Sequence, residues 1–125
     1  MTPVSVELPL RLRSSANLRE HWARRAERVA GERAVVRFML SAQRDWKPDG
    51  GPCVVTLTRV APRELDDDNL AHAFKAIRDG VADALGVDDR DPRVTWGYAQ
   101  RRGPYAIVVE VREKKWDGDT RQTLV

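Results

Sequence analysis

The sequence has few of the residues on which disulfides, zinc sites and membrane spans depend. Its single cysteine, Cys53, cannot form a disulfide within the chain or a cysteine-based zinc site. The longest apolar run, Tyr105 to Val109, has five residues, far fewer than the roughly 20 that cross a bilayer. The first residues alternate between polar and apolar types and contain no hydrophobic signal region. We therefore expect a cytoplasmic protein in a reducing compartment, with no membrane partner and with Cys53 buried as a small apolar side chain.

Charge, by contrast, is abundant and unevenly distributed. The 22 basic and 19 acidic residues give a net charge of +3, but residues 66–91 carry 3 basic and 8 acidic groups. The segments before and after this acidic region have net charges of +5 and +3. Eighteen of the basic residues are arginine, whose planar guanidinium group matches the oxygens of a phosphate. The arginine excess indicates either phosphate binding or the codon bias of a GC-rich genome.

Apolar periodicity predicts a single domain with the element order β-α-β-α-β-β. The expected elements are a strand at residues 4–12, a helix at roughly 16–44, a strand at 54–60, a helix at 69–85, and strands at about 93–101 and 104–114. Arg101 to Pro104 indicate a hairpin turn between the last two strands. We therefore expect an α/β fold in which a mixed sheet of about four strands packs against two helices. The domain would span residues 1–115, and residues 116–125 would form a flexible tail.

Both predicted helices have one apolar face. In the second helix the apolar residues recur at helical spacing and predict a buried face that consists of Leu70, Phe74, Ile77, Val81 and Leu85. Gly86 then suits the left-handed position that ends a helix. The first helix has a weaker stripe, interrupted by Arg33: Leu18, Trp22, Ala26, Val29, Val36 and Leu40. Gly31 makes a kink possible within this helix.

Arginines are concentrated on the other face of the first helix and in the predicted hairpin turn. They are Arg24, Arg25, Arg28 and Arg37 on the helix, and Arg101 and Arg102 in the turn. Such a run is either an ordinary solvated surface or a surface that contacts the phosphates of a nucleic acid.

Three consecutive aspartates, Asp66 to Asp68, precede the second helix. A single aspartate there would cap the helix and interact favourably with its dipole, but three repel one another and exceed what capping needs. If residues 65–68 are extended, Asp66 and Asp68 point to the same side of the chain. Two carboxylates that face one point suit a hard divalent cation, so the run predicts a Mg²⁺ or Mn²⁺ site rather than a zinc site.

A second acidic cluster, which contains Asp88 and Asp89, follows the same helix. Seventeen residues would separate the two clusters by roughly 25 Å along a straight helix. The clusters can share a metal only if the loop after Gly86 folds back, or if a partner subunit brings its own cluster near. The helix between them also has a polar face, formed by His72, Lys75, Asp79 and Asp83. For the last two of these residues we expect an ordinary solvated surface.

The run Leu65-Asp66-Asp67-Asp68-Asn69-Leu70, followed about 20 residues later by Gly86-Val87-Asp88-Asp89, resembles the RusA-like Holliday junction resolvases. These are small endodeoxyribonucleases, common in phages and prophages, with a mixed α/β fold. The resemblance covers roughly residues 60–100. It implies a homodimer that uses Mg²⁺ to cut the strands of a four-way DNA junction symmetrically.

The resemblance also implies roles for individual residues. Those that correspond to the family's metal-binding acids are Asp66, Asp68 and Asp89, with Asp88 beside the last. Asn69 corresponds to an asparagine that can orient a carboxylate or a phosphate. Where the family has a functional lysine this chain has His72, and Lys75, one turn further along the helix, could supply the cation instead.

We therefore expect a Mg²⁺-dependent endonuclease of branched DNA that acts in recombination and repair. Carboxylates would bind the metal, Lys75 or His72 would offset charge on the phosphate or accept a proton, and arginines would contact the DNA backbone. Two alternatives use the same residues. One is a non-catalytic phage DNA-binding protein in which the acids only cap a helix and add solubilising charge, and the other is a metal-dependent hydrolase of nucleotides.

Overall fold

A four-stranded mixed sheet and three helices make up residues 2–12 and 22–114, the part of the chain that the computed structural model describes. The strands, in chain order, are β1 (Val4–Leu8), β2 (Cys53–Ala61), β3 (Val94–Arg102) and β4 (Ala106–Glu113). Their order across the sheet is β1-β4-β2-β3. β4 is antiparallel to both of its neighbours, whereas β3 is parallel to β2. The predicted α/β class with a mixed sheet is confirmed, and the predicted tail lies outside the described residues.

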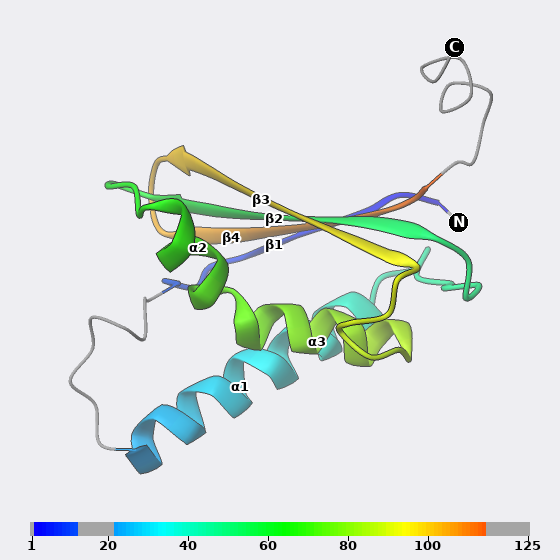
Figure 1. Ribbon diagram of the computed structural model, residues 1–125, viewed down its shortest axis with the longest axis horizontal. Helices are drawn as coiled ribbons and strands as arrows, with labels where there is room; N and C mark the ends of the chain where they lie inside the picture. Colours follow the sequence, from blue (N-terminus) through cyan, green and yellow to red (C-terminus); the bar gives the residue numbers. More distant parts are fainter. Residues whose placement is uncertain (1, 13–21, 115–125) are drawn as a thin grey trace.

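All three helices lie on one face of the sheet (Figure 1). They are α1 (Trp22–Ser41), α2 (Asp67–Ala73) and α3 (Lys75–Leu85). Side chains alternate between the two faces of a strand, so every second residue of a strand points toward the helices. The largest buried side chains at these positions and on the helices form one core: Leu8, Val55, Leu57, Ile107, Val109, Val111, Val36, Leu40, Phe74, Ile77 and Val81. No helix within residues 22–114 is long and apolar enough to cross a membrane.

The predicted hairpin between the last two strands is wrong, because β2 lies between β3 and β4. The segment that joins them passes over the end of β2, where the backbone N–H of Gly103 donates to the carbonyl oxygen of Ala61 at 3.1 Å. A Cβ atom at Gly103 would lie 3.0 Å from the side chain of Val60. Turn residues in a sequence show where a strand ends but not which strand pairs with it. Here the helical connection from β2 to β3 makes these two parallel neighbours, and β4 takes the other side of β2.

The predicted helix over residues 69–85 is two helices that meet at Phe74. The backbone of Phe74 has φ −83° and ψ 1°, and its N–H is shared between the carbonyl oxygens of Leu70 and Ala71. The Phe74 side chain is fully buried, and its ring lies 5.9 Å from that of Tyr98 on β3. The apolar stripe continues through the break, so periodicity carried no signal of it. The predicted end of the helix is confirmed, because Gly86 has φ 74°.

Of the apolar stripe predicted for the first helix, Leu18 lies outside the described residues, and the remainder is only half correct. Val36 and Leu40 are buried, but Trp22 is 76% exposed and Ala26 is also exposed. The amino-terminal half of α1 extends past α3 in Figure 1, so α3 does not cover that face. The helix is continuous through Gly31, without the break that the glycine made possible.

The α1 and α3 helices approach each other closely at Gly80. A Cβ atom at this position would lie 2.5 Å from the backbone carbonyl oxygen of Arg33 and 3.0 Å from the Cβ atom of Val36. Arg33 also donates from Nε and Nη2 to the two carboxylate oxygens of Asp83, at 2.6 and 2.8 Å. Asp83, for which we expected a solvated surface, is partly exposed there, and Arg33, which interrupts the apolar stripe of α1, pairs with it across the two helices. This ion pair lowers the pKa of Asp83 and raises that of Arg33.

Because of the Gly80 contact, replacing a glycine by alanine should have opposite effects on stability in α3 and in α1. Gly80→Ala should destabilise the protein by about 1–3 kcal/mol, because the added methyl group displaces the α1 backbone. Gly31→Ala, the matched control, has no atom within 4 Å of the new Cβ and should stabilise the protein by about 0.5–1 kcal/mol through helix propensity. Urea unfolding measures both differences. Equal stabilisation by the two substitutions would contradict the close approach of α1 and α3.

Candidate functional site

The three consecutive aspartates lie at the exposed start of α2. Asp66 immediately precedes the helix with an extended backbone (φ −69°, ψ 159°), and its carboxylate accepts a hydrogen bond from the side-chain amide of Asn69. Asp67 and Asp68 form part of the first helical turn. The expectation that residues 65–68 are extended is therefore wrong beyond Asp66, and strand alternation does not align Asp66 with Asp68. All three carboxylates are exposed, at the helix end whose dipole favours negative charge.

Two side chains from the sheet hold the segment that leads to Asp66. Gln100 on β3 donates to the carbonyl oxygen of Leu65 at 2.6 Å and accepts from the backbone N–H of Leu65 at 2.9 Å. Arg59, its register partner on β2, donates from Nη1 to the carbonyl oxygen of Arg63. The sequence predictions missed both residues. The sequence did contain one indication. Arg59 lies two residues beyond Leu57, at a strand position where the alternation of side chains predicts an apolar residue.

The loop after α3 folds back toward the start of that helix (Figure 1). Its Asp89 carboxylate accepts a hydrogen bond from Nζ of Lys75 at 2.8 Å, and the same ammonium donates to Asp79 at 2.9 Å. The carbonyl oxygen of Asp89 accepts from Nη2 of Arg78 at 2.8 Å and from the indole N–H of Trp96 at 3.0 Å. The loop after α3 therefore folds back within the same chain, which is one of the two ways of bringing the acidic clusters together.

Arg78 links the returning loop to the sheet. Its guanidinium lies 4.6 Å from the centre of the Trp96 ring and donates from Nη1 to the Tyr98 hydroxyl at 3.0 Å. Its buried Nε has no hydrogen-bond partner and lies 3.6 Å from the carboxylate of Asp89. The hydrogen bond from Lys75, together with the charge of Arg78, lowers the pKa of Asp89, and the hydrogen bonds to Asp89 and Asp79 raise the pKa of Lys75.

The acidic residues share one side of the sheet without forming a compact cluster. Gln100 holds the segment before Asp66 and Trp96 binds Asp89, and these two residues are four positions apart on β3, roughly 13 Å along a strand. Among the described residues, no group of three or more His, Cys, Asp or Glu side chains could hold a metal ion as it stands.

The other residues predicted for the site have separate positions. His72 is exposed in the last turn of α2, three residues before Lys75. Asp88 is exposed, and its carboxylate accepts the backbone N–H of Arg90 at 2.8 Å, which fixes the turn beside Asp89. Asp79, for which we expected a solvated surface, is half-buried and bonded to Lys75.

The predicted basic residues lie on two separate parts of the molecule. Arg24 and Arg25 are exposed on α1, and Arg28 forms an ion pair with Glu32 one turn further along, at 3.3 Å. At the far end of β3, an open cleft of about 410 Å³ surrounds the segment that joins β3 to β4. Its lining includes Arg101, Arg102, Gly103, Pro104, Tyr105 and Glu7.

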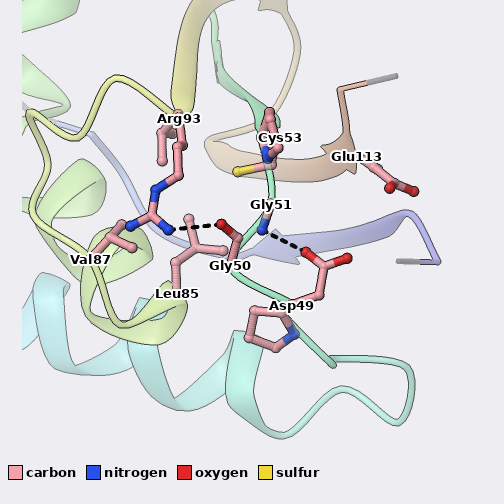
Figure 2. Close-up of a pocket in the computed structure, with 11 residues that line it drawn as sticks. Asp49, Gly50, Gly51, Cys53, Leu85, Val87, Arg93 and Glu113 are labelled. Atoms are coloured by element: carbon pink, nitrogen blue, oxygen red, sulfur yellow. Dashed lines mark hydrogen bonds between the residues drawn. The ribbon is translucent and has the colours of Figure 1, made fainter. Parts of the chain in front are cut away.

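A second pocket lies at the opposite end of β2, around Cys53 (Figure 2). Arg93 donates there to the carbonyl oxygen of Gly50 at 2.8 Å and pairs with Asp91, whose pKa it lowers to about 2. Cys53 is buried, as predicted, and burial raises the pKa of its thiol. A thiol that resists ionisation is a poor nucleophile.

Comparison with known proteins identifies a relative without an assigned activity. Over 82 residues the chain is 39% identical to an uncharacterized protein of Xylella fastidiosa (strain Temecula1 / ATCC 700964). The match covers 61% of this chain and 53% of the relative, so the chain spans about half the length of that protein. No protein-family model matches the chain.

The ion pair between Lys75 and Asp89 predicts a pH-dependent effect of Lys75→Met. The folded-state pKa of Asp89 is depressed, so its carboxylate stabilises the fold at pH values above its ordinary pKa of 3.8 and loses this effect as the pH falls through the folded value. At pH 7, Lys75→Met should lower the free energy of unfolding by less than about 1 kcal/mol, because the Lys75 side chain is largely exposed. The difference should shrink in strong acid.

Carboxyl-detected NMR titration measures the site directly. Lys75→Met should raise the Asp89 pKa toward its ordinary value, whereas the control Lys47→Met, a substitution of an exposed lysine in the loop before β2, should leave it unchanged. An Asp89 pKa that is the same in Lys75→Met and in the unsubstituted protein would show that the ion pair does not form in solution.

Proposed function

We propose that this protein is a Mg²⁺-dependent endodeoxyribonuclease of the RusA-like type that acts on four-way or other branched DNA. The observation that carries the proposal is the return of Asp89 to the start of α3, where its carboxylate lies 2.8 Å from Nζ of Lys75. Lys75 is the first residue of α3, which follows α2 directly after the break at Phe74, and Asp68 lies in the first turn of α2. One chain therefore presents the two acidic clusters on the same side of the sheet, as a shared metal site requires.

The donor atoms in this region fit a hard cation by their chemistry. Asp66 and Asp68 offer exposed carboxylate oxygens, the ligands that Mg²⁺ and Mn²⁺ prefer. Together with Asp89 they would hold the ion, which when bound polarises a phosphate and lowers the pKa of a water molecule. Asp89 is neutralised by the Lys75 ammonium in its present position, so metal binding requires this carboxylate to exchange one cation for another.

The surrounding side chains account for the remaining steps. The ammonium of Lys75, once it leaves Asp89, offsets the negative charge that develops on the phosphate. Exposed His72 lies one helical turn beyond Asp68, and its imidazole would serve as the proton acceptor. Asn69 holds the Asp66 carboxylate through its side-chain amide.

Basic residues that come before and after the acidic region in the sequence would bind the DNA backbone. Arg101 and Arg102 line the open cleft beyond β3, and Arg24, Arg25 and Arg28 lie on α1. Contacts of arginine with phosphates are independent of base sequence and weaken as salt increases. A homodimer with twofold symmetry would present two such sites, as paired cuts across a four-way junction require.

A second candidate function is DNA binding without cleavage. It is favoured by the finding that no group of three metal-binding side chains is gathered among the described residues. In that case Asp66 to Asp68 only stabilise the start of α2 through its dipole, and Lys75 remains paired with Asp89.

A cleavage assay on a synthetic four-way junction separates these functions. With Mg²⁺ the unsubstituted protein should nick the junction, and EDTA should abolish nicking. Asp68→Asn should reduce the rate by at least about 100-fold, because it removes a metal-binding carboxylate and keeps the side-chain volume. The matched control is Asp45→Asn, a substitution of an exposed aspartate in the loop after α1, which should leave the rate unchanged.

Equal nicking by Asp68→Asn and the unsubstituted protein would refute metal-dependent cleavage at this site. Junction binding with no nicking under any metal condition would establish the second candidate function instead.

A further inference from the structure

Arg59 carries a buried positive charge that no carboxylate balances. It lies on the helix-facing side of β2 at a position next to Gln100, and only 8% of its surface is exposed. Its side-chain hydrogen bond within the described residues runs from Nη1 to the carbonyl oxygen of Arg63. The buried Nε has no hydrogen-bond partner. None of the ion pairs among the described residues includes Arg59.

An arrangement of this kind is energetically costly. Buried charges in proteins are normally paired, because the loss of hydration must be offset by an opposite charge and by complete hydrogen bonding. Here burial lowers the pKa of Arg59; Tyr105 acts in the opposite direction, and the positive charge of Arg11 adds a smaller lowering effect. A missing anion is the simplest group that would offset both the burial and the repulsion between two guanidinium groups.

Arg11 supplies an accessible cation in the same region. It is exposed, and its guanidinium lies 4.7 Å from the centre of the Tyr105 ring, in the segment that passes over the end of β2. A guanidinium that stacks on an aromatic ring is held in one orientation. Its N–H groups lie in a plane parallel to the ring and can still donate hydrogen bonds. The same segment borders the open cleft that Arg101 and Arg102 line, where Glu7 is the one acidic residue of the lining.

We propose that Arg11 and Arg59 form a binding site for a phosphate group at the end of β2. Neither arginine has a carboxylate partner among the described residues, and a guanidinium matches the oxygens of a phosphate, which the exposed Arg11 can contact with two parallel hydrogen bonds. Arg59 is bonded to Arg63, three residues before Asp66, so the bound phosphate would lie beside the acidic region. The identity of the phosphate rests on the proposed function: it is a backbone phosphate of the DNA, next to the phosphate that is cut.

The first experiment measures DNA binding without cleavage. Fluorescence anisotropy with a labelled four-way junction in EDTA gives the affinity of the unsubstituted protein and of its variants. Arg11→Gln should weaken binding about tenfold, the loss expected for one charge-assisted contact, and should reduce the salt dependence of binding. Arg112→Gln, the matched control, removes an exposed arginine from the sheet face opposite the helices and should change affinity less than twofold.

The second experiment uses inorganic phosphate as the probe and extends the test to the buried residue. Phosphate in place of chloride at equal ionic strength should raise the midpoint of thermal unfolding by roughly 2–4 °C more in the unsubstituted protein than in Arg11→Gln. Arg59→Lys keeps the positive charge but loses the guanidinium geometry, and it should lose the same increment. Unfolding in chloride shows whether this variant remains folded, and Arg11→Gln, an exposed substitution, decides the question if it does not.

Each outcome has one meaning. If Arg11→Gln loses both the phosphate increment and DNA affinity, the site binds a DNA phosphate. If it loses the increment alone, a phosphate site exists but its assignment to the DNA backbone is overturned. If it behaves like Arg112→Gln in both measurements, there is no phosphate site. None of these results depends on cleavage, so they stand apart from the effect of Asp68→Asn on nicking.

Discussion

The return of the loop after α3 is the constraint on which the candidate site depends. Residues 86–93 would otherwise leave Asp89 at the far end of a helix, remote from the aspartates that begin α2. Three donors prevent this, because the Lys75 ammonium binds the Asp89 carboxylate while Arg78 and Trp96 bind its carbonyl oxygen. Two of these contacts are made to the backbone, so they position the loop whatever the ionisation state of the carboxylate. The ammonium contact is made to the carboxylate itself and must change if a metal binds there.

Charge is arranged around β2 and β3 in a way that the net value of +3 conceals. The acidic residues lie along α2, α3 and the loop that follows, on the helix-bearing side of the sheet. Arg59 lies near the end of β2 on this same side, whereas the cleft lined by Arg101 lies at that end of the strand on the opposite face of the sheet. Arg59 and Gln100 connect the two regions, since they hold the short segment that runs from the end of β2 to Asp66. A phosphate backbone bound by the arginines would therefore lie next to the carboxylates.

Local sequence patterns predicted the elements of this fold well, because each pattern reflects a local cause. The buried stripe from Leu70 to Val81 and the left-handed Gly86 follow from helix geometry and from the conformational freedom of glycine. Strand pairing is not local, so the turn after β3 was mistaken for a hairpin when β2 in fact separates the two strands. The break at Phe74 was invisible for a different reason, since it preserves the apolar stripe.

Contacts between distant elements explain what could not be predicted about the site. Asp83 belongs to the polar face of its helix by sequence, yet Arg33 reaches it from α1. The position of Asp89 depends on Lys75, Arg78 and Trp96 together, and no motif contains all three. Arg59 and Gln100 could have been suspected, because each is a polar residue on a strand face that otherwise points into the core. Their partners, the carbonyl groups of residues 63 and 65, carry no sequence signal at all.

The most direct test of the central claim, that Asp66, Asp68 and Asp89 form one metal site within one chain, is paramagnetic broadening by Mn²⁺. Backbone amide signals are recorded while Mn²⁺ is added to the ¹⁵N-labelled protein. A shared site predicts that the amides of residues 66–69 and of residues 88–90 lose intensity together at the same Mn²⁺ concentration, and that Asp89→Asn weakens both effects. Broadening confined to residues 66–69, unchanged by Asp89→Asn, would contradict the claim.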